Sequence, residues 1–173
     1  MANVIREQRL VDSTKRALIK YVITSDGTAD ANTVLVDVST LSNALNANGQ
    51  LMVSNTHPLT TYRTSIKRVF GYGAGNVGGA VVLRWHANGQ NTEIVSVGSG
   101  AFDYNFEAMG DGAVITNPNP DGAANTGDIL YSSTLANGGV VTLFIDLKKD
   151  NKNYSAGQHV RPSDFNYGQY GIK

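Results

Sequence analysis

The stretch that decides the fold reads A-V-V-L-R-W-H (80–86), A-N-G-Q-N (87–91) and T-E-I-V-S-V (92–97). The first and third runs are rich in β-branched and aromatic residues, which favour strands. Asn88-Gly89 lies between them, and both residues tolerate the positive φ that a tight reversal needs. The stretch therefore predicts an antiparallel hairpin in the middle of the chain.

Similar short runs recur on both sides of this hairpin. The pattern predicts further strands at residues 14–23, 33–38, 62–70, 101–106, 128–131 and 140–147, with a short one at 113–116. A total of seven to nine strands favours an all-β fold, a two-sheet β-sandwich or jelly-roll with long polar loops and extended termini.

Three local expectations accompany this fold. Residues 14–23 and 33–38 are expected to pair as a hairpin with a long turn, and 39–51 to form one or two helical turns. The run V-V-T-L-F-I-D-L (140–147) is the most hydrophobic in the chain, so it is expected to be a central strand buried on both faces. We expect four side chains of this strand to be largely buried: Val141, Leu143, Phe144 and Ile145.

The composition narrows the class of protein further. The chain has 173 residues, 16% charged residues, 19 glycines and no cysteine, which indicates one all-β domain without disulfides, thiolate zinc sites or cysteine nucleophiles. Its formal net charge is zero, so charge gives no reason to expect nucleic acid or an anionic membrane as a partner. The absence of a long apolar run predicts a soluble protein made in the cytosol.

The two ends of the chain lack a periodic pattern. Residues 1–13 are expected to be an N-terminal arm, 14–150 the β-sandwich domain, and 151–173 a Tyr/Gly-rich C-terminal tail. Aromatic and apolar residues in such segments are typical of protein interfaces. The candidates for partner contacts are Val4, Ile5, Leu10, Tyr154, Phe165, Tyr167 and Tyr170. The alternatives are a frayed or locally docked N-terminus and a tail that wraps its own domain.

No motif indicates catalysis or a bound cofactor. The glycines between 71 and 79 are followed by a strand rather than by a helix with a Lys-Ser/Thr pair, so a flexible connection is favoured over a phosphate loop. The aspartates Asp26, Asp30, Asp111 and Asp121 lack calcium-loop spacing and are expected in Asx turns. The histidines His57, His86 and His159 form no local metal motif. We therefore expect no enzyme, no metal and no cofactor.

Six segments read D-S-T-K-R-A-L-I-K-Y-V (12–22), N-T-V-L-V-D-V-S-T-L (32–41), V-V-L-R-W-H-A-N-G (81–89), G-S-G-A-F-D-Y-N-F (98–106), G-D-I-L-Y-S-S-T (127–134) and V-V-T-L-F-I-D-L-K-K (140–149). Together they resemble small virion structural proteins of tailed bacteriophages, particularly those of cyanobacterial and other marine phages. The resemblance is one of general pattern and extends to about residue 150.

The resemblance implies a non-enzymatic virion component, made in the host cytoplasm and carried on the capsid surface. The first choice is a capsid decoration or cement protein, trimeric, that binds the major capsid protein and neighbouring copies of itself. The second is a neck or tail component. From a different class, a carbohydrate-binding β-sandwich would use Trp85, Tyr72 and the aromatic tail as its sugar platform.

Overall fold

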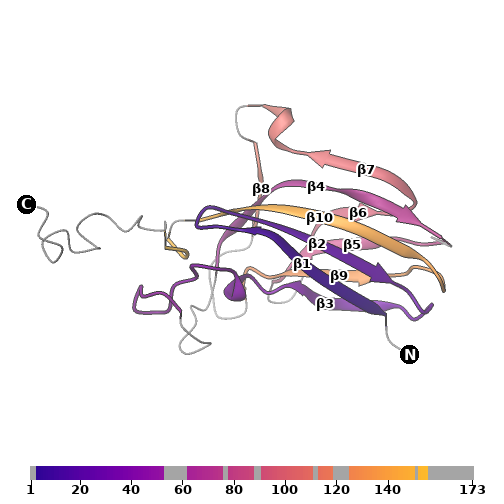
Figure 1. The fold of residues 1–173 in the computed structure, drawn as a ribbon, viewed down its shortest axis with the longest axis horizontal. Helices are drawn as coiled ribbons and strands as arrows, with labels where there is room; N and C mark the ends of the chain where they lie inside the picture. Colours follow the sequence, from indigo (N-terminus) through magenta and orange to yellow (C-terminus); the bar gives the residue numbers. More distant parts are fainter. Residues whose placement is uncertain are drawn as a thin grey trace, which may run out of the picture.

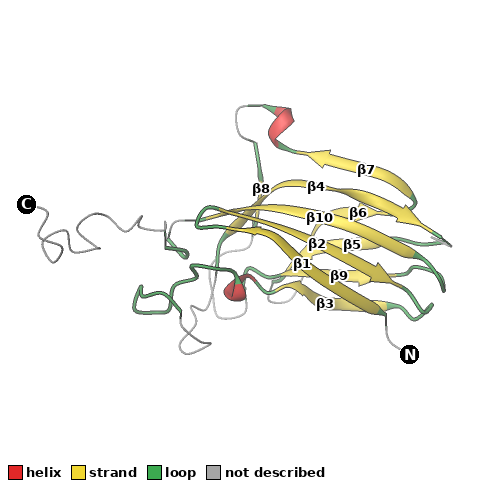
Figure 2. Cartoon of the chain, in the orientation of Figure 1, coloured by secondary structure: helices red, strands yellow, loops and turns green. Residues whose placement is uncertain are grey.

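The protein is a β-sandwich of two antiparallel sheets packed face to face (Figures 1 and 2). The computed structural model describes residues 3–52, 62–75, 78–87, 91–110, 113–118, 125–150 and 152–155. The elements are β1 (Val4–Asp12), β2 (Arg16–Thr24), β3 (Asp30–Val36), η1 (Val38–Thr40), β4 (Thr64–Ala74), β5 (Val81–Trp85), β6 (Thr92–Val97), β7 (Gly100–Asn105), η2 (Glu107–Met109), β8 (Ile115–Thr116), β9 (Ile129–Ser133) and β10 (Val140–Lys149). The predicted all-β, two-sheet fold is confirmed.

The strand order is that of a jelly roll. The six-stranded sheet runs β1-β2-β10-β4-β7, with β8 also paired to β4, and the four-stranded sheet runs β3-β9-β5-β6. Apart from β1 and β8, the strands pair from the outside of the sequence inward: β2 with β10, β3 with β9, β4 with β7 and β5 with β6. A long antiparallel ribbon rolled into two sheets has this order.

The central hairpin forms as predicted. The strands β5 and β6 pair from Val81↔Val97 to Trp85↔Thr92, with one register shift after Leu83. The Trp85 side chain is buried in the core between the sheets. The turn at Asn88-Gly89 lies outside the described residues.

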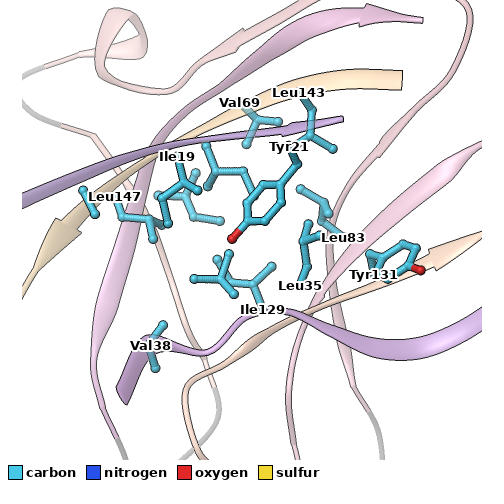
Figure 3. Packing of buried hydrophobic residues seen from close by; sticks show 14 of the residues in the cluster. Ile19, Tyr21, Leu35, Val38, Val69, Leu83, Ile129, Tyr131, Leu143 and Leu147 are labelled. Atoms are coloured by element: carbon cyan, nitrogen blue, oxygen red, sulfur yellow. The ribbon is translucent and has the colours of Figure 1, made fainter. Parts of the chain in front are cut away.

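One core lies between the two sheets (Figure 3). Alternate residues of β2 and β10 point inward, including Ile19, Tyr21, Leu143 and Leu147, and all four are buried. They face Leu35, Leu83 and Ile129 from the four-stranded sheet. Each fully buried aliphatic side chain of this kind contributes about 1.5–3 kcal/mol by leaving water.

The prediction for β10 is wrong for one of its faces. Val141, Leu143 and Ile145 are fully buried as expected, but Phe144 points to the outer face of the six-stranded sheet and is only half-buried. A sandwich with two layers covers one face of each sheet, so a continuous apolar run does not by itself mean burial on both faces. The strand is central in its sheet, between β2 and β4.

Two other local expectations are also wrong. β2 and β3 do not pair with each other: β2 lies between β1 and β10, whereas β3 pairs with β9 in the other sheet. The connection 25–29 crosses from one sheet to the other instead of closing a hairpin. The predicted helical turns reduce to the 3-10 turn η1, capped by the Asp37 carboxylate, which accepts a hydrogen bond from the Ser39 backbone N–H.

The glycines after residue 70 have a structural role within β4. Gly71 and Gly73 lie inside this strand, which continues to Ala74 rather than ending at 70. A Cβ at Gly71 would overlap the carbonyl oxygen of Thr142 and lie 2.9 Å from Cζ of Phe102. These positions therefore serve close packing between strands and are not the predicted flexible connection.

Candidate interaction surfaces

The predicted N-terminal arm is a strand of the sheet. β1 pairs with β2 along its length, from Val4↔Thr24 to Asp12↔Ala17, so residues 4–12 belong to the domain rather than to a separate arm. Val4 and Leu10 are 51% and 43% exposed, whereas Ile5 packs against the core. The sequence showed no sign of this strand because its inward-facing positions include the charged residues Glu7 and Arg9. Partner contact through Val4 and Leu10 stays a prediction.

Tyr154 is not at a surface, which corrects its assignment as a partner contact. Its side chain is fully buried, its hydroxyl donates to the Val38 carbonyl oxygen at 2.7 Å, and its ring lies 5.6 Å from the ring of Tyr62. The start of the predicted tail therefore belongs to the domain, which extends at least to Ser155. The other three tail candidates, Phe165, Tyr167 and Tyr170, lie outside the described residues.

Beside Tyr154 lies a buried lysine. The Lys149 ammonium has no exposed surface and donates to the carboxylate of Asp12 and to the carbonyl oxygens of Ser13 and Ser42, the latter two at 2.8 and 2.7 Å. Burial acts to raise the pKa of Asp12, but the hydrogen bonds from Lys149 and Ser42 outweigh it and lower the pKa. This cluster fixes the end of β10 to the β1–β2 turn and to the loop after η1.

A second polar cluster contains the one described histidine. His86 Nδ1 lies 3.0 Å from the Thr126 hydroxyl, which donates to the Asp128 carboxylate at 2.6 Å. The other Asp128 oxygen accepts the Val38 backbone N–H at 3.0 Å, and burial raises the pKa of Asp128. A triad would place the histidine between the hydroxyl and the carboxylate. Here the hydroxyl lies between the other two, so the cluster holds β5, β9 and η1 together.

Two cavities formed by described residues are lined by polar and charged side chains. One of about 410 Å³ is lined by Lys15, Ser65, Lys148, Lys149 and Asp150. Another of about 420 Å³ is lined by Arg84, Asn91, Thr92 and Glu93. Sites for small organic ligands are mostly apolar, so neither cavity has the chemistry of such a site. Within the described ranges, no group of three or more His, Asp or Glu side chains is arranged to hold a metal ion.

The outer face of the six-stranded sheet carries a ladder of rings and cations. The rings of Phe70 and Phe144 are stacked, with centroids 4.8 Å apart and planes 5° from parallel. Lys20 Nζ lies 5.9 Å from the centroid of Phe144, and the Arg68 guanidinium lies 4.6 Å from that of Phe70. Arg68 also donates twice to Asp103 on β7, at 2.8 and 2.5 Å. The ladder thus links β2, β10, β4 and β7.

This ladder bears on the carbohydrate alternative. A sugar stacks on a free ring face, but the rings of Phe70 and Phe144 cover each other and are flanked by cations. Trp85, part of the predicted platform, is buried. Of the residues expected to form the sugar platform, Tyr72 is described and exposed, at 56%.

The free edge of β7 lies at the opposite side of the sheet from β1 (Figure 1). Its aromatic residues Phe102 and Tyr104 face inward, opposite Gly71 and Val69 of β4. Phe102 is half-buried, and Tyr104 is 37% exposed. The sequence predicted a strand at 101–106, but it did not show that the strand lies at an edge.

Comparison of the chain with protein-family models, with curated proteins and with solved structures finds no match. No helix among the described residues is long and apolar enough to cross a membrane. The function is therefore argued from the surfaces themselves.

Proposed function

We propose that this chain is a non-enzymatic structural protein of a tailed-bacteriophage virion, a capsid decoration or cement protein that bridges major capsid subunits. In this proposal it is made in the host cytoplasm, forms trimers on the capsid surface, and binds neither nucleic acid nor membrane. The sequence resemblance to small phage virion proteins is its starting point. The jelly-roll order supports it by analogy of fold alone, because viral capsid domains share this order with lectins and cupins.

The observation that carries the proposal is where the exposed apolar side chains lie. Val4, Leu10 and Val11 are exposed on β1, and Tyr104 is exposed on β7, so both edges of the larger sheet present apolar groups. Among the described residues, Val34 on β3, Tyr72 on β4, Leu51 and Met109 are exposed as well. The two cavities described above, by contrast, are lined by polar and charged side chains. Apolar groups on edges suit contact with another protein surface. Many copies, each weakly held, together give stable attachment to a particle.

The proposal is tested with particles assembled from the major capsid protein without this chain. The purified full chain is expected to sediment with them and to raise their resistance to heat and osmotic shock. A Val4→Asp/Leu10→Asp variant should lower occupancy roughly tenfold, because it places charges in a desolvated contact. The matched control is Val34→Asp, which changes an equally exposed valine on β3 in the other sheet. A chain that fails to sediment with particles contradicts the proposal.

The same experiment separates the alternatives. Labelled chain found at the neck or tail of intact virions would replace the capsid-surface assignment with a neck or tail component. Binding to glycans that is lost in Tyr72→Ala, without binding to particles, would favour the carbohydrate-binding module.

A further inference from the structure

We propose that the free edge of β7 receives the C-terminal segment Phe165–Tyr170 of a neighbouring copy as an added strand. This inference rests on the proposed function, in which copies of the chain contact one another on a particle. It goes beyond that function by naming the acceptor strand and the segment that binds to it.

The first step compares the edges of the two sheets. An exposed edge strand presents unpaired N–H and C=O groups, and proteins block such edges with bulges, inward-pointing charges or covering groups. β1 has a register shift after Arg9 and inward-facing Glu7 and Arg9, and Arg9 donates to the Thr40 carbonyl oxygen at 2.7 Å. β3 has two register shifts, and its Asn32 has φ of 50°. These two edges are blocked.

The edge of β6 is also partly covered. The Tyr104 hydroxyl of β7 donates to the Ser96 carbonyl oxygen of β6 at 3.3 Å. The Tyr104 side chain therefore occupies one backbone carbonyl group of β6.

Among the described residues, β7 shows none of these protections from Ala101 to Asn105; only Gly100, at its start, has a positive φ, of 83°. It pairs with β4 over six consecutive positions, Arg68↔Asn105 to Gly73↔Gly100, without a register shift. It contains no proline, and its one charged residue, Asp103, faces outward and is paired with Arg68. Its inward-facing residues are the aromatic Phe102 and Tyr104. A regular edge with apolar inward side chains is the type that accepts another strand.

The sequence of the chain offers a matching strand. Residues 165–167 read Phe-Asn-Tyr, which repeats the aromatic, polar, aromatic order of Phe102, Asp103 and Tyr104. Alternate residues of a strand share a face, so Phe165 and Tyr167 would lie beside Phe102 and Tyr104 while Asn166 lies beside Asp103. Residues 165–172 also carry no charged side chain, so addition would bury no unpaired charge.

The length of the segment allows the contact. The last described residue, Ser155, is fixed by a backbone hydrogen bond from its N–H to the Asn43 carbonyl oxygen. The ten residues from there to Phe165 span at most about 33–36 Å when extended, enough to reach an adjacent molecule. Insertion of one copy's segment into the next copy is a head-to-tail contact, which closes into a ring when the rotation permits. The proposed trimer is such a ring.

The test uses the full chain, with hydrogen exchange of backbone amides and molar mass measured as a function of concentration. We expect the amides of 100–105 to exchange about tenfold more slowly in the oligomer than in the dilute monomer, because an added strand bonds to the free edge. An excess of a synthetic peptide of residues 162–173 should dissociate the oligomer and keep these amides protected. A scrambled peptide is the control.

Two variants locate the contact. Tyr104→Lys places an inward charge on the edge and should weaken oligomerisation at least about tenfold, as inward charges do on natural edge strands. Tyr72→Lys is the matched control, an exposed tyrosine on the outer face of the adjacent strand, and should change it less than about twofold. Phe165→Ser/Tyr167→Ser should match the effect of Tyr104→Lys. Circular dichroism confirms that each variant is folded.

Several results would overturn the inference. One is protection of β1, β3 or β6 in place of β7; another is a Tyr104→Lys chain that oligomerises like the parent. Protection of 100–105 that does not depend on concentration in a monomeric chain would mean that the segment binds its own β7, which also contradicts the proposal. Particle binding is measured separately. A chain that binds particles but shows no protection of the β7 amides contradicts this inference alone. A chain that oligomerises through β7 but does not bind particles contradicts the proposed function.

Discussion

The ammonium of Lys149, near the end of β10, is paired with the carboxylate of Asp12 at the end of β1, and the lysine side chain has no exposed surface. The pair joins residues 137 positions apart in the sequence. Two carbonyl oxygens, of Ser13 and Ser42, accept the remaining ammonium protons. The cation is thus fully hydrogen-bonded in a site without water-exposed surface.

Removing one partner of this pair should destabilise the fold strongly. For Lys149→Met we expect a loss of about 3 kcal/mol in the free energy of unfolding, because the Asp12 carboxylate stays buried without its cation. The loss is at the low end for such pairs, since the Ser42 N–H still donates to Asp12 at 2.9 Å. The double variant Lys149→Met/Asp12→Leu should recover part of it, as measured by urea denaturation. A single variant as stable as the parent would contradict the burial of the charge.

The same pair predicts a dependence on pH. The pKa of Asp12 is lowered in the folded protein, so its contribution to stability is complete above the unfolded pKa of about 3.9 and is lost as pH falls through the folded value. The difference in unfolding free energy between the parent and Asp12→Asn should therefore be constant from about pH 7 to 5 and shrink below about pH 4. Urea denaturation at each pH measures it. A difference that grows on acidification would contradict this sign.

The two faces of β10 should respond differently to truncation. Leu143→Ala leaves a cavity in the core and should cost about 3–5 kcal/mol. Phe144→Ala removes a stacked pair and a cation–π contact from the outer face and should cost about 1–2 kcal/mol. The neighbouring positions serve as controls for each other in one denaturation series. Equal losses would mean that the outer face of the sheet is covered like the inner one.

Gly71 should not tolerate a side chain. In Gly71→Ala the new Cβ would overlap the Thr142 carbonyl oxygen and crowd Phe102, so the backbone of β4 or β10 must shift, at a cost of about 1–3 kcal/mol or more. Gly98→Ala is the control, because its Cβ would meet only the Gly79 carbonyl oxygen, at 3.4 Å. Thermal unfolding of both variants measures the difference. A stable Gly71→Ala chain would show that β4 and β10 are farther apart than described here.

Two truncations should differ because of Tyr154. A chain ending at Ser155 keeps this buried ring and should retain the circular dichroism of the β domain. A chain ending at Asp150 loses it, and losing a large buried aromatic costs about 3–5 kcal/mol. Denaturation of the two chains compares them directly. If both are equally stable, the packing of Tyr154 contributes little and the tail begins at 151 after all.

The sequence alone determined the local part of this structure. The β5–β6 hairpin and the strands β2 and β7 all followed from residue type and the pattern of short β-prone runs. Such features depend on neighbours a few residues away, so their signal lies within one short window of sequence. The candidate residues Val4 and Leu10 were also identified as apolar groups available for contact, and the structure leaves them exposed.

Only the tertiary structure decided which strands meet and which faces are covered. The sequence pattern distinguishes the two faces of a strand, but it does not show which face is covered by the other sheet. Phe144 was therefore expected in the core, although it lies on the outer face of its sheet. β1 was missed because its inward-facing positions include charged residues. Tyr154 was assigned to a surface because its partners, Val38 and Tyr62, are far away in the sequence. Whether these residues are buried depends on which distant segments pack against them, and this cannot be predicted from the neighbouring sequence.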